Sequence, residues 1–267
     1  MKLLAIDMDG TCVYGRGNVS DRTINALRKA AKAGIEIVPT TGRTVSCMPG
    51  KIKNEPYIRY AVTSNGASVL NLKTKEKIYE SAVPFDIGNS LINEFAGQKF
   101  GISAHIHDEY IVQGKIFAAL GNLIYGKDSE NSITVASLAD YIKEEKPGFE
   151  ELQFYFSPFA GKEKARSILS KYADANIKSA FGNIYVEVFS ESATKGNGLS
   201  SLADYLKVDV SEIACIGDGE NDLSMFRASG MKFAMGNAVE ELKSHADYIL
   251  PSNREDGVAE AIEKYLL

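Results

Sequence analysis

Residues 2–11 read KLLAIDMDGT, and this stretch decides the fold class of the chain. The apolar run is too short for a helix and is typical of a buried strand. It ends in Asp7 and Asp9, followed by Gly10 and Thr11. Open α/β sheets bind ligands at the carboxyl ends of their strands. Because adjacent carboxylates repel each other unless a cation or a shared proton relieves them, we expect an aspartyl nucleophile beside an acid/base, with a hard cation between them.

The overall composition is that of a soluble globular protein. The chain has 267 residues, 45% of them hydrophobic and 24% charged, which is enough for the core of one large domain or two. A net charge of −5 argues against a protein that binds nucleic acid by electrostatic attraction. The three cysteines lie far apart and form no CxxC pair, which argues against a disulfide framework or a structural zinc site.

The sequence also bears on location and assembly. No stretch approaches the roughly 18 apolar residues of a membrane span. The opening MKLLAI is too short for the core of a signal peptide before Asp7 interrupts it. We therefore expect a cytoplasmic protein with no membrane partner. The sequence leaves the oligomeric state open and slightly favours a monomer.

Strands and helices alternate in the first and last thirds of the chain. Runs with the length of buried strands occupy residues 3–6, 35–39, 60–63, 213–216, 232–235 and 248–250. Stretches with helical patterning occupy residues 20–34, 196–206, 239–244 and 256–266. Ser20 or Asp21 is the expected cap of the first helix, and Gly34 its end. This alternation predicts an α/β fold with a doubly wound parallel sheet.

The middle of the chain, residues 83–188, follows a different pattern. Its helix-like segments lie at residues 87–95 and 162–173. Its strands come in adjacent pairs joined by short turns, at residues 103–107 with 110–113 and 177–180 with 184–188. A further hairpin, residues 68–72 with 77–83, comes just before this region. The pattern predicts a mixed α+β insert in an α/β core.

Four short segments carry residues suited to chemistry. Each follows a predicted core strand or opens a helix, and the carboxyl ends of parallel strands share one edge. The segments are Asp7-Met8-Asp9-Gly10-Thr11, Thr41-Gly42-Arg43, Lys195-Gly196 and Gly217-Asp218-Gly219-Glu220-Asn221-Asp222. Gly-rich turns at helix starts bind phosphate oxygens, and clustered carboxylates favour Mg²⁺. A lysine beside them neutralises charge that develops in phosphoryl transfer.

These segments resemble the motifs of the haloacid dehalogenase (HAD) superfamily, Cof-type subclass IIB phosphatases. They match DxDGT, [ST]GR, the motif lysine with its glycine, and GDxxND, in the family's order. The stretches SNGA (64–67), AMGNA (234–238) and EDGVAEAI (255–262) are similar to Cof-type sequence as well. The resemblance implies a Rossmannoid core of residues 1–82 and 189–267. It also implies an α+β cap of residues 83–188 that sets substrate specificity, bound Mg²⁺ and an aspartyl-phosphate intermediate.

The resemblance also implies a role for each motif residue. Asp7 would be the nucleophile and a metal ligand. Asp9 would be the acid/base and give its backbone C=O to the metal. Asp218 would bind the metal with Asp222 in support. The phosphoryl group would be held by Thr41, Gly42, Lys195, Asn221 and the backbone of Met8. Two departures are Cys12, where leucine is common, and residues 190–196, SESATKG, which differ from the usual PxGVSKG.

The sequence thus predicts a Mg²⁺-dependent phosphatase of small phosphorylated metabolites, such as a sugar phosphate or a cofactor-type monophosphate. One alternative is a phosphomutase or phosphotransferase on the same core. Another is a non-catalytic sensor of such metabolites, which the intact catalytic positions argue against.

Several residues have simpler interpretations. Arg43 is expected to pair with a carboxylate rather than to contact substrate. His105 and His107 form an HxH on one strand face, for which surface or substrate-lining positions are favoured over a metal site. Residues 154–156, FYF, are expected to be cap core. Glu187 matches a glutamate common at the cap end in the subclass, and could equally be an ordinary polar strand residue.

Overall fold

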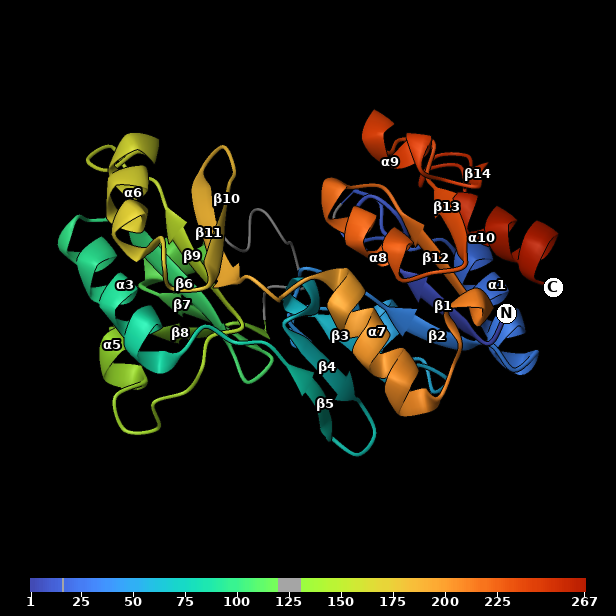
Figure 1. The fold of residues 1–267 in the computed structure, drawn as a ribbon, viewed down its shortest axis with the longest axis horizontal. Coiled ribbons are helices and arrows are strands. Elements are labelled where there is room, and N and C mark those ends of the chain that lie inside the picture. The colour runs from blue at the N-terminus through green and yellow to red at the C-terminus, as the bar shows by residue number, and fades with distance from the viewer. Residues whose placement is uncertain (16, 120–130) are drawn as a thin grey trace.

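The computed structural model describes residues 1–15, 17–119 and 131–267, which form two lobes side by side (Figure 1). The lobe at the right holds both labelled ends of the chain, and we call it the core. The lobe at the left is formed by the described residues of 83–188, and we call it the cap. Each lobe has a hydrophobic cluster of its own. The division into two domains at residues 82/83 and 188/189 stays a prediction.

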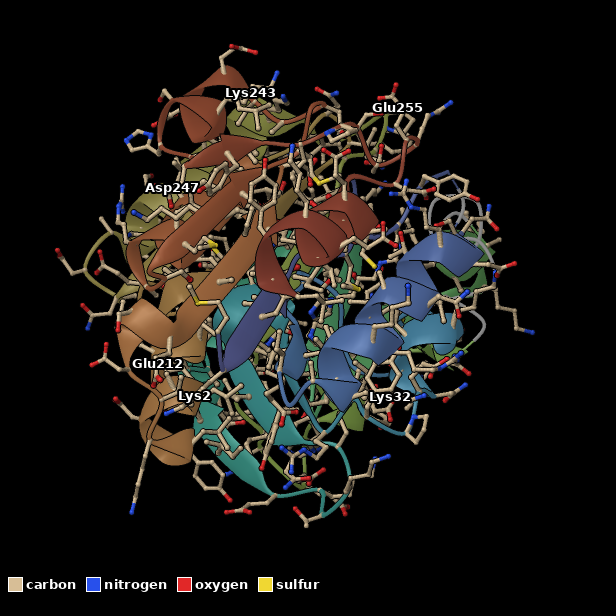
Figure 2. All side chains as sticks on the ribbon, turned by 90° about the vertical axis from the view of Figure 1, so that its right-hand side faces the viewer. Lys2, Lys32, Glu212, Lys243, Asp247 and Glu255 are labelled. Carbon is tan, nitrogen blue, oxygen red and sulfur yellow. The ribbon has the colours of Figure 1, made fainter. Side chains whose placement is uncertain are left out.

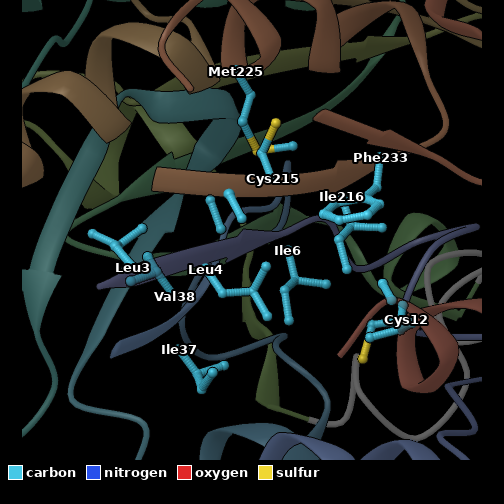
Figure 3. Packing of buried hydrophobic residues seen from close by; sticks show 14 of the residues in the cluster. Leu3, Leu4, Ile6, Cys12, Ile37, Val38, Cys215, Ile216, Met225 and Phe233 are labelled. Atoms are coloured by element: carbon cyan, nitrogen blue, oxygen red, sulfur yellow. The ribbon is translucent and has the colours of Figure 1, made fainter. Parts of the chain in front are cut away.

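The core is built on a parallel sheet, whose strand order among the described residues is β14-β13-β12-β1-β2. Its strands are β1 (Leu3–Ile6), β2 (Glu36–Pro39), β12 (Ile213–Gly217), β13 (Met231–Ala234) and β14 (Tyr248–Ile249). Strand β1 lies between β12 and β2, and its side chains are buried on both faces (Figure 3). Burial on both faces explains why this strand reads as a continuous apolar run. The predicted α/β class with a parallel core sheet is confirmed.

The strand expected at residues 60–63 forms, but in a different sheet. It is β3 (Tyr60–Thr63), which pairs antiparallel with β4 (Ser68–Asn71), and β4 pairs with β5 (Lys77–Glu80). A single parallel bridge between Thr40 and Val62 joins β3 to the chain that leaves β2. The parallel sheet therefore continues into the predicted hairpin of β4 and β5, and the cap follows from there.

Helices cover both faces of the core sheet (Figure 1). On one face α1 (Asp21–Lys32) contacts α10 (Gly257–Ala261), and on the other α7 (Lys195–Leu206) contacts α8 (Leu223–Arg227). The hydroxyl of Ser20 accepts a hydrogen bond from the backbone N–H of Thr23 at 3.0 Å, so Ser20, one of the two expected caps, is the cap of α1. The shorter helical elements of the core are α2 (Gly50–Lys53), α9 (Glu240–Ser244), η1 (Ser64–Gly66), η4 (Val210–Glu212), η5 (Glu220–Asp222) and the π-turn η6 (Ile262–Leu266).

The cap contains a mixed sheet, and the helices α3, α5 and α6 lie on the side of the sheet away from the core (Figure 1). The strand order among the described residues is β10-β11-β9-β6-β7-β8. The strands are β6 (Gly101–Ile106), β7 (Glu109–Gln113), β8 (Ile133–Val135), β9 (Glu151–Tyr155), β10 (Ile177–Phe181) and β11 (Tyr185–Ser190). The helical elements are α3 (Phe85–Gly97), α5 (Leu138–Tyr141), α6 (Lys162–Leu169) and the short η3 (Ser170–Tyr172). The other face of the sheet is directed at the core.

Most elements expected in the cap are confirmed. Both hairpins form, as β6–β7 and β10–β11, and the two helices form as α3 and α6. Strand β9 was not predicted, although it lies between β6 and β11. Along β9, Phe154 is buried and stacks on Phe95 with 3.7 Å between ring centroids, so its assignment to the cap core is confirmed. Tyr155, the next residue, points to the opposite face of the sheet.

The surface and the cysteines agree with the sequence analysis. Charged side chains project from the core, and Lys2 pairs with Glu212 at 2.9 Å (Figure 2). The three cysteines are buried and free, as expected for a chain without disulfides. Within the ranges that the structure describes, no helix is long and apolar enough to cross a bilayer.

Candidate active site

The site begins where β1 and β12 end side by side. Ile6 is in register with Ile216, so the next residues along both strands, Asp7 on one and the loop to Asp218 on the other, leave the sheet together. This is the arrangement expected at the carboxyl edge of a parallel sheet. The two acids come from positions 211 residues apart in the sequence, and the sheet register alone brings them to one place.

Lys195 lies between two of the acids. Its Nζ is 2.5 Å from Oδ1 of Asp7 and 2.7 Å from Oδ1 of Asp222, and all three side chains are buried. Burial alone would lower the pKa of Lys195, but Asp222 and Asp7 outweigh it and raise the pKa. Burial raises the pKa of Asp7 well above its usual range, and Lys195 offsets this only in part. The pKa of Lys195 rises because of its acidic neighbours, whereas the pKa of Asp7 rises mainly through burial, with a smaller contribution from the charges of Asp222 and Asp218.

The acid group itself fits a divalent metal ion. Ligand oxygens of Asp7, Asp218 and Asp222 all lie within 4.8 Å of one another. Oxygen donors of this kind suit a hard cation such as Mg²⁺. Burial, with the charge of Asp222, also raises the pKa of Asp218, so one lysine does not neutralise the group. A bound cation would supply the missing positive charge and lower these pKa values again.

The neighbours of the acids fix their orientation. Both oxygens of Asp222 are occupied, since Oδ1 accepts from Lys195 and Oδ2 accepts from the backbone N–H of Asp218 at 2.8 Å and of Gly219 at 3.0 Å. Thr11 donates its hydroxyl to Oδ1 of Asp218 at 2.6 Å. Asp222 therefore holds the loop that presents Asp218, and Thr11 holds the carboxylate of Asp218 from the side of β1.

Asp9 is placed differently from Asp7. Its carboxylate is half-exposed and accepts two hydrogen bonds from Arg43, at 2.7 Å from Nε and 2.6 Å from Nη2. It is not part of the acid group that could hold a metal within the described residues. The cation that relieves its charge is therefore the guanidinium group of Arg43. The expectation that Arg43 pairs with a carboxylate is confirmed.

The other motif residues surround the acids. Gly42 and Asn221 line the same cavity as Asp7, whereas Thr41 and Met8 are buried next to it. The hydroxyl of Thr41 accepts from the backbone N–H of Arg43 at 3.1 Å. The four sequence motifs thus meet in one place, although their individual roles stay predictions.

A cavity of about 360 Å³ lies between these motif residues of the core and the cap. The core contributes ten lining residues, namely Asp7, Asp9, Gly42, Arg43, Thr44, Cys47, Asn65, Asp218, Gly219 and Asn221. From the cap, five polar side chains reach the cavity, namely His105, Tyr110, Gln153, Tyr185 and Glu187. They stand on alternate positions of neighbouring strands, so the face of the cap sheet that meets the core is polar. A cavity of this size with a polar lining suits a small polar ligand.

The two cap histidines do not share a face. Strand β6 ends at Ile106, and His107 lies in the following turn with a φ of 52°, exposed and 3.6 Å from Glu145. The interpretation of His105 and His107 as an HxH on one strand face is therefore wrong, because the chain turns between them. His105 is buried, lines the cavity and lies 3.0 Å from the hydroxyl of Ser64, and burial lowers its pKa to about 3.

Glu187, which is half-buried, forms an acid pair in the cap with the buried Glu151. It lines the cavity, and burial raises its pKa. Burial, followed by the charge of Glu187, raises the pKa of Glu151 on the adjacent strand β9. Of the two, only Glu187 lines the cavity, and its carboxyl group is able to accept a hydrogen bond from a hydroxyl group of a ligand.

Sequence reasoning missed several residues that shape the site. Asn65, Gln153 and Tyr110 line the cavity, and Asn237 donates to the backbone C=O of Gly10 at 2.8 Å. Asn65 is the second residue after the end of β3, so the rule that found Asp7 at the end of a strand could have found it. The cap residues had no such signal, because their proximity depends on how the insert lies against the core.

The family follows from a comparison with known proteins. A model of the haloacid dehalogenase-like hydrolases matches residues 4–262. The chain belongs to this family. Its predicted enzyme class, a phosphoric monoester hydrolase, is confirmed by the family and by relatives that are phosphatases. Hydrolases of this family generally use a divalent metal, in agreement with the group of three aspartates.

Individual relatives cover the whole chain. Phosphatase YwpJ of Bacillus subtilis is 30% identical, and the alignment covers 100% of both chains. A 5-amino-6-(5-phospho-D-ribitylamino)uracil phosphatase of the same organism, YwtE, is 25% identical over 100% of this chain and 98% of its own. The crystal structure of a haloacid dehalogenase-like hydrolase from Bacteroides thetaiotaomicron superposes with a TM-score of 0.85 at 26% identity, covering 98% of each chain.

Proposed function

We propose that the protein is a Mg²⁺-dependent phosphatase of small phosphorylated metabolites, such as a sugar phosphate or a cofactor-type monophosphate. It acts through an aspartyl-phosphate on Asp7. The observation that carries the proposal is the buried group of Asp7, Asp218 and Asp222 around Lys195, at the floor of a cavity that the cap covers. Three acids held so close together, and compensated by one lysine, suit a site that receives a cation with a phosphate group.

The residues that would hold Mg²⁺ are the carboxylates of Asp7 and Asp218 and the backbone C=O of Asp9. Asp222 would support them indirectly, because its own oxygens are bound to Lys195 and to the loop of Asp218. When bound, the ion would offset negative charge on the phosphoryl oxygens.

In the first step an oxygen of Asp7 attacks phosphorus, and the bond from phosphorus to the leaving oxygen breaks. Asp9 gives that oxygen a proton. In the second step Asp9 takes a proton from water, which attacks phosphorus, releases inorganic phosphate and restores Asp7. Lys195 lies 2.5 Å from Asp7, so its charge is available to the transferring oxygens. Thr41, Gly42, Asn221 and the backbone of Met8 hold the phosphoryl group in this scheme.

Arg43 sets the position of Asp9 before substrate enters. Its two hydrogen bonds hold the carboxylate at the wall of the cavity. The leaving oxygen of a substrate has to compete with Arg43 for Asp9. The cap provides the pocket for the leaving group, and its hydroxyl, amide and carboxyl groups suit a ligand rich in hydroxyl groups.

Replacement of the proposed nucleophile tests this function. We expect Asp7→Asn to abolish release of inorganic phosphate from a panel of phosphorylated metabolites, because the amide keeps the shape of the carboxylate but is not a nucleophile. Asp204→Asn, on the exposed surface of α7, is the matched control and should keep full activity. The same assays distinguish a phosphatase from a phosphomutase, since a mutase yields an isomerised phosphate ester. Substantial turnover by clean, folded Asp7→Asn protein would overturn the covalent mechanism.

A further inference from the structure

The turn Ser64–Gly66 lies between the core motifs and the cap. All three of its residues have left-handed backbone angles, with φ of 48°, 55° and 93°. A Cβ on Gly66 would lie 2.0 Å from the backbone oxygen of Thr194, directly before Lys195, so the turn is pressed against that motif. The backbone N–H of Asn65 donates to the C=O of Thr41 at 3.0 Å. The turn is thereby fixed to two of the four motif segments.

The side chain of Asn65 connects a third motif to the cap. Its Oδ1 accepts a hydrogen bond from Nδ2 of Asn221 at 3.1 Å, and its Nδ2 donates to Oε2 of Glu151 in β9 at 3.1 Å. The amide lies against Gly42, where a Cβ would approach it to 3.1 Å. Asn65 is therefore in contact with the phosphate-binding residues proposed above and with one buried acid of the cap.

The cap end of this connection is held firmly. Glu151 is 1% exposed, and its Oε1 accepts from Nε2 of Gln153 at 2.7 Å. The oxygen of Gln153 accepts in turn from the hydroxyls of Ser103 at 3.0 Å and Tyr155 at 2.8 Å. These donors fix which way the amide of Gln153 faces, and Gln153 fixes Glu151. A continuous chain of hydrogen bonds thus runs from the cap sheet to Asn221.

We propose that Asn65 is a positioning residue through which Glu151 of the cap orients Asn221 for the phosphoryl group. The inference rests on the proposed function, because it takes Asn221 to bind phosphate. If the proposal holds, the cap contributes to the affinity for the phosphate group itself. Glu151 makes this contribution indirectly, through its hydrogen bond to Asn65 and that of Asn65 to Asn221. Leaving-group recognition and phosphate binding are then coupled rather than divided between the two lobes.

The experiment is calorimetric titration of the protein with inorganic phosphate in the presence of Mg²⁺. Inorganic phosphate is used because it has no leaving group for the cap to contact. Asn65→Gly removes the side chain and suits the left-handed backbone at this position. Glu151→Leu removes the cap acceptor, and Glu151→Gln keeps one acceptor oxygen for two donors. Loss of one such hydrogen bond should weaken phosphate binding about three- to tenfold. Glu151→Gln should lie between wild type and Glu151→Leu. Glu145→Gln, an exposed cap glutamate, should bind like wild type.

We call the connection from Glu151 through Asn65 to Asn221 the relay. The double variant Asn65→Gly with Glu151→Leu shows whether the two residues affect phosphate binding through this relay or independently. In a relay it binds phosphate no more weakly than the weaker single variant. If the loss of phosphate affinity in the double variant equals the product of the losses in the two single variants, the residues act independently and the relay is wrong. An unchanged phosphate Kd in both folded Glu151 variants would also overturn the relay, since Asn65 would then act within the core alone. If wild-type protein with Mg²⁺ fails to bind phosphate, the proposed function fails and takes the relay with it. Binding by wild type and by all variants alike refutes the relay only.

Discussion

At the scale of single residues, the site brings together three carboxylates, each of which needs a partner to offset the cost of its burial. Asp7, Asp218 and Asp222 are held together by Lys195, by Thr11 and by backbone N–H groups. These partners offset the cost of burying the carboxylates, yet the group keeps an excess of negative charge. This excess is the physical reason to expect a cation, and it makes the effect of metal removal predictable.

We expect EDTA to abolish phosphate release and added Mg²⁺ to restore it. Mg²⁺ should also raise the melting temperature of wild-type protein, because a ligand that binds only the folded state stabilises it. The rise should be smaller for Asp218→Asn, which lacks one ligand, and unchanged for the exposed Asp204→Asn. Full activity in metal-free buffer would show that the acid group serves another purpose.

His105 predicts a dependence of stability on pH. Burial lowers its pKa to about 3, whereas an unfolded histidine titrates near 6.5. Between these values the unfolded state binds a proton that the folded state does not. The free energy of unfolding should therefore fall as the pH drops from about 6.5 toward 3, and the histidine should have no effect above that window.

His105→Asn should flatten this part of the profile, measured by urea unfolding at a series of pH values. The exposed His245→Asn is the control and should leave the profile unchanged. A profile of His105→Asn with the same acid slope as wild type would mean that other groups cause the loss of stability.

At the scale of elements, the loop that leaves β1 depends on a glycine. Gly10 has a φ of 86°, and a Cβ there would lie 2.2 Å from Oδ2 of Asp218. Gly34 has a φ of 90°, with nothing within 4 Å of the same position. The two glycines are thus matched in backbone conformation and differ only in what surrounds them.

Gly10→Ala should therefore weaken activation by Mg²⁺ at least tenfold, because Asp218 must move, whereas Gly34→Ala should not. Both variants should lose about 1–2 kcal/mol of stability from the left-handed backbone. The measurements are phosphate release against Mg²⁺ concentration, and urea unfolding. Equal Mg²⁺ activation in the two variants would argue that the loop adapts to the added methyl group.

What the sequence could predict also divides by element. Motifs at the ends of parallel strands were predictable, since the sheet edge gathers whatever follows each strand. Strand β9 and its residues Glu151 and Gln153 were not, because polar residues on one face of a strand resemble an exposed surface until the partner lobe is in place. The sequence predicted that Arg43 pairs with a carboxylate, but it did not predict that this carboxylate belongs to Asp9.

At the scale of the whole molecule, two lobes share one cavity. The four motifs all belong to the core, while five cap side chains complete the cavity wall. Replacement of residues 83–188 by a short linker should therefore spare part of the chemistry. We expect slow cleavage of an aryl phosphate, whose leaving group needs little help. The preferred metabolite should lose far more in kcat/KM, because its binding to the cap is lost.

Activity assays on the folded, Mg²⁺-binding truncation measure both effects. Equal loss with both substrates would indicate that the cap carries essential chemistry, and His105 and Glu187 would be the first side chains to replace. The full-length protein assayed beside it serves as the reference for both substrates.

The place of β1 in the core sheet has a consequence for how the protein is made. Residues 3–6 leave the ribosome long before residues 213–217, which form β12, one of their two neighbouring strands. The cap strands lie between them in sequence and need no later partner. During synthesis the cap is therefore able to fold while β1 still lacks one side of its sheet. The strand that leads to the proposed nucleophile is therefore translated before the cap, yet it reaches its final environment only after the cap strands have been made.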